Sequence, residues 1–238
     1  DQQGGVYHSL YDSFDHYVRF GDPDFSYGVA LSKVAGHMVL RMADAQLLPL
    51  RFADFADTVG NYVDEIHKLT SDEREQSKTL ARLLDRRAFK LAADPTEQLL
   101  PPARETPVPY LDLAPLDNAV ARLKTSARTY DQAYVQAVAA GDGTLSAENR
   151  KVDQQLQSIE QSLLDPNGLP GRAWYRHMIY APGLLTGYGV KTLPGVREAI
   201  EQHQFDQANH YAEIVARVLD AYSEKLEKAA GMLQHQKT

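Results

Sequence analysis

Apolar residues recur along most of the chain at alternating spacings of three and four, the pattern of an amphipathic helix. The longest such stripe lies near the C-terminus and comprises Phe205, Ala208, Ala212, Val215, Leu219, Tyr222, Leu226, Ala229 and Leu233. It predicts a helix that packs nearly parallel to a neighbour. The neighbour could be a separate binding partner or the core of one bundle. We favour the bundle core, because several other predicted helices need the same core.

The same periodicity predicts five further helices. They cover residues 24–45, 55–66, 70–93, 116–137 and 152–163. The first contains Ala35-Gly36, and since glycine costs about 1 kcal/mol relative to alanine inside a helix, we expect a neighbouring helix to approach closely there. The third begins at Thr70-Ser71-Asp72-Glu73, a capping-box sequence that predicts a helix start.

Strand patterns are nearly absent. Val108-Pro109-Tyr110-Leu111 is bordered by prolines and indicates an extended linker instead of a sheet strand. Residues 95–115 contain six prolines, which is typical of a long surface excursion. The predicted fold class is therefore all-α, a helical bundle.

Residues 165–195 interrupt the helical pattern. They contain six of the 15 glycines and the single tryptophan, Trp174. A long loop of this composition before the last helix is either functional or an ordered plug at the end of the bundle. Its basic side chains would suit a carboxylate ligand: Arg172, Arg176, His177 and Lys191.

Composition excludes several classes of function. The 238 residues carry 32 acidic and 25 basic side chains, a net charge of −7, which argues against a surface for nucleic acid or anionic lipid. Cysteine is absent, so thiol nucleophiles and cysteine-ligated zinc are excluded. No apolar run reaches the length of about 18 residues that a membrane-spanning helix needs. The chain begins without methionine, which we interpret as a processed end or the boundary of an expressed fragment.

A complete active site is not recognisable. The eight histidines are scattered, and neither Glu-x-x-His nor His-Glu-x-x-His occurs, so we expect no self-contained metal site. The Gly-x-Ser-x-Gly pattern of nucleophilic hydrolases and phosphate-binding glycine loops are missing as well.

Several motifs together resemble one known family. Tyr7-His8-Ser9-Leu10-Tyr11-Asp12-Ser13 is similar to a motif near the end of the peptidase domain in the glutamate carboxypeptidase II and transferrin receptor family. Phe20-Gly21-Asp22-Pro23 and the run from Leu169 to Pro182 resemble later segments of the same family, as do Tyr188 and Pro194-Gly195. The resemblance covers the chain except for residues 70–110, which we interpret as an insertion.

The resemblance implies a domain organisation. Family members combine a di-zinc aminopeptidase-like domain, an apical domain and a C-terminal helical domain that pairs two protomers. By this resemblance, residues 1–20 are the end of the peptidase domain, and residues 21–238 are a four-helix-bundle-like dimerisation domain with a long loop before its last helix. The implied partners are a second copy, the parent's peptidase domain and its peptide substrate, and the implied location is outside the cytoplasm.

The resemblance also implies roles for single residues. His8 corresponds to a zinc ligand and Tyr7 to the tyrosine that stabilises the tetrahedral intermediate. The remaining ligands of the two zinc ions and the general base would lie upstream, so the 238 residues are expected to be inactive alone although the parent is a zinc carboxypeptidase. Tyr188 corresponds to a tyrosine in the loop that senses the substrate's C-terminal carboxylate. Gly187 replaces the lysine of glutamate-preferring relatives, and Lys191 could substitute for it.

A second interpretation comes from a different class. The chain could be a freestanding helical protein that binds a small anionic ligand through Arg172, Arg176, His177 and Tyr188. Catalysis or stoichiometric zinc binding by the purified 238-residue chain would favour it over a dimerisation domain.

Overall fold

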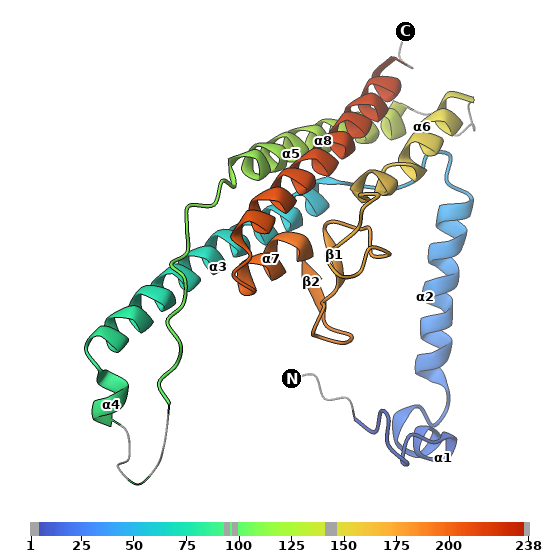
Figure 1. Cartoon of the computed structure of the whole chain (residues 1–238). Helices are drawn as coiled ribbons and strands as arrows, with labels where there is room; N and C mark the ends of the chain where they lie inside the picture. The colour runs from blue at the N-terminus through green and yellow to red at the C-terminus, as the bar shows by residue number, and fades with distance from the viewer. Residues whose placement is uncertain (1–4, 93–95, 97–99, 141–146, 236–238) are drawn as a thin grey trace. The chain divides into compact units, whose positions relative to one another are not determined.

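The computed structural model describes residues 5–92, 96, 100–140 and 147–235 (Figure 1). The chain forms two compact units, Asp1–Pro49 and Leu50–Thr238. The predicted boundary after residue 20 therefore falls inside the first unit. The assignment of residues 1–20 to a peptidase domain, and of residues 70–110 to an insertion, stays a prediction.

The first unit consists of two short helical turns and one long helix. Helix α1 spans Phe14–His16, a π-helical turn spans Tyr17–Gly21, and α2 spans Ser26–Ala43. Asp22 fixes the start of α2, because its carboxylate accepts hydrogen bonds from the backbone N–H groups of Gly28 (2.7 Å) and Tyr27 (3.1 Å). Burial opposes the charge on Asp22, but these two hydrogen bonds leave its pKa lowered. The helix predicted over residues 24–45 is thus confirmed.

Helix α2 buries none of its residues. Its apolar side chains are all exposed, including the predicted stripe of Tyr27, Leu31, Val34, Met38 and Met42. Gly36 has no atom within 4 Å of the position that a Cβ would occupy. The close neighbour predicted from Ala35-Gly36 is therefore not found among the described residues.

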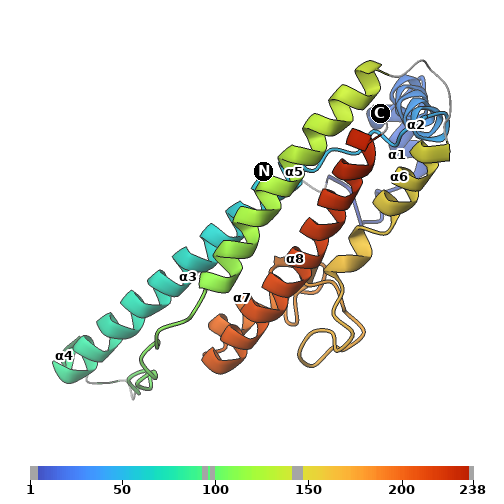
Figure 2. The ribbon, with the colours of Figure 1, turned by 90° about the horizontal axis from the view of Figure 1, so that it is seen from above.

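The second unit is a helical bundle (Figures 1 and 2). Its elements are α3 (Ala53–Asp85), α4 (Ala88–Ala92), α5 (Ala114–Ala140), α6 (Ala147–Gln157), a 3-10 turn (Glu160–Leu163), β1 (Tyr180–Pro182), β2 (Val190–Thr192), α7 (Pro194–Glu201) and α8 (Phe205–His235). Helices α5 and α8 lie side by side and parallel, with Arg122 bonded to Asp220 and Ser126 to Glu227. Helix α3 is antiparallel to α5.

The core of the bundle forms around α8. All nine residues of the predicted C-terminal stripe are buried; α8 packs chiefly against α5, and α5 packs in turn against α3, each helix through buried residues of its own. On α5 these include Leu116, Leu123, Ala127 and Tyr130, and on α3 they include Val59, Val63 and Ile66. The prediction of an all-α bundle core is confirmed.

A buried carboxylate joins α5 to the start of α3. Asp131 of α5 is 5% exposed and accepts hydrogen bonds from the N–H groups of Phe52 (3.0 Å) and Ala53 (3.3 Å). Arg51 lies 3.1 Å from the same carboxylate. An acceptor placed here satisfies the free N–H groups at a helix N-terminus, and the pairing fixes where α3 begins.

The prediction of separate helices over residues 55–66 and 70–93 is wrong, because α3 runs unbroken from Ala53 to Asp85. Thr70 does not cap a helix start; its hydroxyl donates to the carbonyl of Ile66 one turn earlier (2.8 Å). No glycine or proline stands between residues 61 and 85 to end the helix. The last buried residue of α3 is Ser77, so its final turns lie outside the core.

Two short strands were missed. Strands β1 and β2 pair antiparallel, with Ala181 opposite Lys191, inside the loop that interrupts the helical pattern. Three residues per strand are too few to show a two-residue alternation. Val108–Leu111 belongs to no helix or strand, as predicted, although Val108 and Leu111 are buried. Residues 93–95 and 97–99 of the predicted proline-rich excursion lie outside the described residues. None of the described helices is both long and apolar enough to cross a membrane.

Candidate functional site

The loop between the 3-10 turn (Glu160–Leu163) and α7 is held in a defined path by its own backbone. Asp165 N–H donates to the Arg176 carbonyl and Leu169 N–H to the Tyr175 carbonyl, each at 2.9 Å. Gly168 has φ +67°, and a Cβ on it would lie 2.1 Å from the Ala173 carbonyl oxygen. The glycine is therefore required by both its conformation and the close approach of the backbone.

Helix α8 anchors the start of this loop. The buried Asp165 carboxylate accepts from Arg217 of α8 (2.7 Å) and from the N–H of Asn167 (2.9 Å). Tyr211 of α8 donates its hydroxyl proton to the Gly168 carbonyl (2.8 Å). The loop is an ordered plug against the bundle, and Asp165 and Tyr211 are structural residues that the sequence analysis did not identify.

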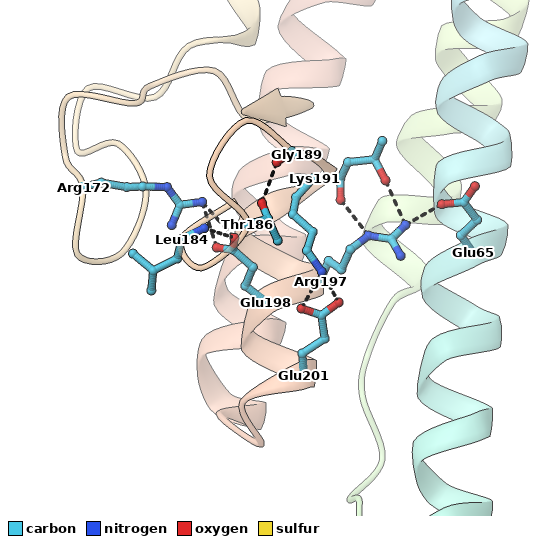
Figure 3. Close-up of polar contacts among 10 residues, drawn as sticks. Glu65, Arg172, Leu184, Thr186, Gly189, Lys191, Arg197, Glu198 and Glu201 are labelled. Carbon is cyan, nitrogen blue, oxygen red and sulfur yellow. Dashed lines mark hydrogen bonds and ion pairs between the residues drawn. The ribbon is translucent and has the colours of Figure 1, made fainter. Parts of the chain in front are cut away.

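A buried ion pair fixes the loop to α7 (Figure 3). The Arg172 guanidinium contacts both carboxylate oxygens of Glu198, at 2.8 and 3.0 Å, and the two side chains are only 5% and 9% exposed. The same carboxylate accepts from the N–H of Leu184 at 2.8 Å. Glu198 therefore holds two segments of the loop at once. Its charge is compensated inside the protein, as a buried carboxylate requires.

The turn between β1 and β2 projects from this anchored base. Thr186 Oγ1 donates to the Gly189 carbonyl (2.6 Å), and the Gly189 N–H donates back to the Thr186 carbonyl (2.9 Å). Gly187 lies at the tip with φ +58° and no atom within 4 Å of a Cβ. Tyr188 is 98% exposed. The turn thus presents an exposed phenol on a hydrogen-bonded base.

Lys191 is paired within the chain. Its ammonium donates to both carboxylate oxygens of Glu201 on α7, at 2.6 and 2.9 Å (Figure 3). Its side chain is 24% exposed. The positive charge of Lys191 is directed toward α7, beside the turn that carries Gly187 and Tyr188.

Arg197 links the hairpin to α3. Its guanidinium donates to the Thr192 carbonyl (3.0 Å) and hydroxyl (2.8 Å), and it pairs with Glu65 of α3 (2.5 Å) (Figure 3). The hairpin is thereby connected to a helix more than a hundred residues earlier in the chain. Neither Arg197 nor Glu65 stands out in the sequence pattern.

His177 also has an internal partner. Its Nε2 lies 3.1 Å from a Glu160 oxygen, and the Tyr180 hydroxyl donates to the same oxygen (3.2 Å). The hydrogen bond from His177 is the main reason that the pKa of Glu160 is lowered. Burial is the main reason that the pKa of Tyr180 is raised. Arg172 contacts Glu198, and His177 contacts Glu160. Two of the four proposed anion-binding side chains therefore bind carboxylates of the chain itself.

Tyr7 and His8 lie in the first unit, before α1. Both are exposed, and their rings stack with centroids 3.9 Å apart. In the parts of the chain that the structure describes, no three His, Asp or Glu side chains gather closely enough to hold a metal ion. His8 by itself supplies one ligand, whereas a zinc site needs three or four.

The fold and the loop place the second unit in the class of helical bundles with an anchored hairpin before the last long helix. The buried charges that anchor the hairpin, Arg172 and Glu198, are paired with each other. Residues 111–227, from just before α5 to within α8, match the family model described as a transferrin receptor-like dimerisation domain. Residues 111–227 carry the features of this dimerisation domain, and most of the chain is similar to members of the transferrin receptor and glutamate carboxypeptidase family. The resemblance inferred from the sequence motifs is confirmed.

Curated relatives support the same assignment. The chain is 29% identical to the probable glutamate carboxypeptidase LAMP1 of Arabidopsis thaliana, over 82% of this chain and 23% of the relative. It is 27% identical to aminopeptidase NAALADL1 of Rattus norvegicus, over 96% of this chain and 26% of the relative. It is 26% identical to a probable glutamate carboxypeptidase of Arthroderma benhamiae, over 87% and 24%. The chain thus spans about a quarter of the length of these relatives.

Proposed function

We propose that this chain is the homodimerisation module of a longer zinc peptidase. The observation that carries the proposal is the match of residues 111–227 to a dimerisation domain, which falls on the helices that build the core around α8. A domain with its own core can present a constant outer surface to a second copy. A two-fold interface of this permanent kind buries about 2,000 Å² or more.

We further propose that the β1–β2 turn contributes to the wall of the parent's substrate site. Tyr188 is the side chain offered to the substrate's C-terminal carboxylate, because its phenol is exposed while the base of the turn is fixed by Glu198. Gly187 at the tip leaves space beside it. The positive charge of Lys191 is largely compensated by Glu201, so it adds little positive potential at the turn. We expect a weaker preference for acidic C-terminal residues than a free lysine at the tip would give.

The chain alone is proposed to lack activity. Tyr7 and His8 would join a di-zinc site only together with ligands and a general base from residues outside this sequence. Zinc there would activate water for peptide hydrolysis. The parent is proposed to act outside the cytoplasm. The alternative, a freestanding anion-binding protein, gains no support from the paired states of Arg172 and His177.

Sedimentation velocity on the purified 238 residues tests the dimer. We expect a dimer at tens of micromolar, and a monomer at that concentration would overturn the proposal. Isothermal titration with zinc is expected to show no stoichiometric site, and His8→Ala should leave the titration unchanged. Zinc binding that is lost in His8→Ala would instead favour a metal site within the chain.

The role of the turn is tested in the longer enzyme. Tyr188→Phe removes one hydrogen bond, which is worth about 0.5–1.5 kcal/mol, so KM for a peptide substrate should rise about two- to thirteenfold. Tyr110 is the matched control, because it is 81% exposed and lies far along the chain from the turn. Equal kinetics for Tyr188→Phe, Tyr110→Phe and the unmodified enzyme would exclude a substrate contact by Tyr188.

A further inference from the structure

A surface cavity lies where the start of α3 meets α5, within the second unit and apart from the loop of residues 165–195. Its volume is about 370 Å³. Cavities that hold small molecules in proteins typically measure about 300–1,000 Å³. The side chains around this one include Arg51, Ala53, Arg128, Gln132, Val135 and Gln136.

The wall from α5 combines hydrogen-bond donors with an apolar surface. Arg128, Gln132 and Gln136 recur every four residues and so share one face of the helix. Val135 lies beside them and is 50% exposed, and Ala53 adds apolar surface from the start of α3. Guanidinium and amide groups that converge on a hollow with an apolar wall are typical of a small-molecule site.

Arg51 is held in place on the opposite side of the cavity. The buried Asp131 carboxylate, which accepts from the N–H groups of Phe52 and Ala53, lies 3.1 Å from Arg51 Nε. The contact uses Nε, and the Arg51 side chain remains 52% exposed. The terminal nitrogens of a guanidinium oriented in this way can bind a second anion in a fixed geometry.

Arg128 is only loosely paired within the chain. Its guanidinium lies 3.5 Å from an Asp57 oxygen, Lys124 lies 3.8 Å from the same oxygen, and the Arg128 side chain is 61% exposed. Exposed pairs contribute little to stability, so Arg128 can exchange Asp57 for a ligand at small cost. Three cations and the two carboxylates of Asp57 and Asp131 leave one positive charge uncompensated here, although the whole chain carries −7.

We propose that this cavity binds a small organic carboxylate. Arg51 and Arg128 donate to the carboxylate, and Val135 packs against its apolar part. A free organic acid and the C-terminal residue of a peptide present the same chemistry. A metal cation is disfavoured by the two guanidinium groups, and inorganic phosphate would make no use of the apolar wall. The proposal requires neither dimerisation nor a substrate contact by the β1–β2 turn.

An NMR titration of the purified 238-residue chain with isovalerate tests the site. We expect a dissociation constant in the millimolar range, with shifts concentrated at residues 51–53 and 128–136. Isovaleramide has the same shape without the charge and should bind at least about tenfold more weakly. Absence of binding up to about 50 mM isovalerate, equal binding of the amide, or shifts confined to other residues would each overturn the proposal.

Two further probes identify the source of the carboxylate. Acetyl-glycyl-valine should bind more tightly than isovalerate if the natural ligand is the end of a peptide, and more weakly if it is a free acid. Either result supports a carboxylate site. Inorganic phosphate is expected to bind more weakly than isovalerate, and tighter binding of phosphate would overturn the assignment of an organic ligand.

A matched pair of substitutions on α5 provides a second readout. Arg128→Met should weaken isovalerate binding about tenfold or more, because it removes a hydrogen bond between two charged groups. Arg122 is the control: it lies on the same helix, is 53% exposed and pairs with Asp220 of α8, away from the cavity. Arg122→Met should leave binding unchanged.

Arg128→Lys separates charge from geometry. Lysine keeps the positive charge but lacks the planar fork that binds a carboxylate through two nitrogens, so its affinity should fall between those of the unmodified chain and Arg128→Met. Circular dichroism checks that each variant is folded, which we expect because Arg122 and Arg128 are both exposed. Equal affinities of Arg128→Met and the unmodified chain, or equal losses in Arg122→Met and Arg128→Met, would overturn the proposal.

Discussion

Helices α2 and α8 carry the same pattern and have opposite surroundings. Each has apolar residues at alternating spacings of three and four, yet the stripe of α8 is entirely buried whereas that of α2 is entirely exposed. Helix α8 meets α5, α6 and α7 within its own unit, while the described residues of the first unit provide no such neighbours for α2. The pattern shows that a helix needs a partner, and it does not show which segment supplies that partner.

The largest difference between the two helices is expected when a charged residue is placed on each apolar stripe. Leu219 of α8 is fully buried, so Leu219→Asp should cost about 4 kcal/mol or more and unfold the bundle. Leu31 of α2 is 70% exposed, and Leu31→Asp should change the stability of the 238-residue chain by less than about 0.5 kcal/mol. Circular dichroism in urea measures both. Similar losses would mean that α2 is buried in the 238-residue chain after all.

The second test concerns the ion pair that fixes the loop to α7. Arg172→Met leaves the Glu198 carboxylate buried without its partner and should cost about 3–5 kcal/mol. Adding Glu198→Met should recover a large part of this loss, since no uncompensated charge remains. Lys191→Met breaks an ion pair whose partner is 34% exposed and should cost less than about 1 kcal/mol. Equal losses for Arg172→Met and Lys191→Met would contradict the buried pair.

Substituting one glycine in each unit by alanine tests how closely the surrounding atoms pack there. A Cβ on Gly195 would lie 2.2 Å from the Tyr211 ring, so Gly195→Ala should destabilise by about 1–3 kcal/mol. Gly36 of α2 has free space around it, and Gly36→Ala should stabilise that helix by about 1 kcal/mol in the 238-residue chain. Thermal unfolding and helical signal measure the two. A destabilising Gly36→Ala would reveal a neighbour against α2.

The smallest expected effect is on acid stability. The pKa of Glu160 is lowered, chiefly by its hydrogen bond from His177, so the folded state binds this proton less readily than the unfolded state. Its contribution is present above about pH 4.5 and is lost as the pH falls through the lowered value. Glu160→Gln should remove this pH dependence of the free energy of unfolding, a change of less than about 1 kcal/mol, because the Glu160 side chain is largely exposed. Urea unfolding from pH 6 to 3 would show no difference if the pair were absent in solution.

Most of the helices could be predicted because their periodicity is long and regular. The nine-residue stripe of α8 gave its length and its buried face. Residues 66–70 show the limit: Thr70 fits a capping box, yet its hydroxyl bonds to the Ile66 carbonyl and the helix continues. A local motif cannot decide between these two uses of a threonine, since both place its oxygen near a backbone group.

The candidate site was only partly predictable. The composition of residues 165–195 indicated an ordered loop with basic side chains, and both features are present. The partner of Arg172 is 26 residues away, at Glu198, and only the folding of the loop onto α7 brings them together. A basic residue considered alone suggests an external anion, whereas the structure supplies an internal one. The same holds for Lys191 with Glu201.

The unbroken α3 has a further consequence. At about 1.5 Å per residue its 33 residues extend about 50 Å. Beyond Ser77 it contains no buried residue. Trypsin cleaves after lysine and arginine, and Lys78, Arg82 and Arg86 lie along or just after this end. Limited trypsin digestion should therefore cut here first and leave a nicked bundle that still unfolds as one cooperative unit. The distal end of α3 is thus a natural place to attach a label or split the polypeptide without disturbing the core.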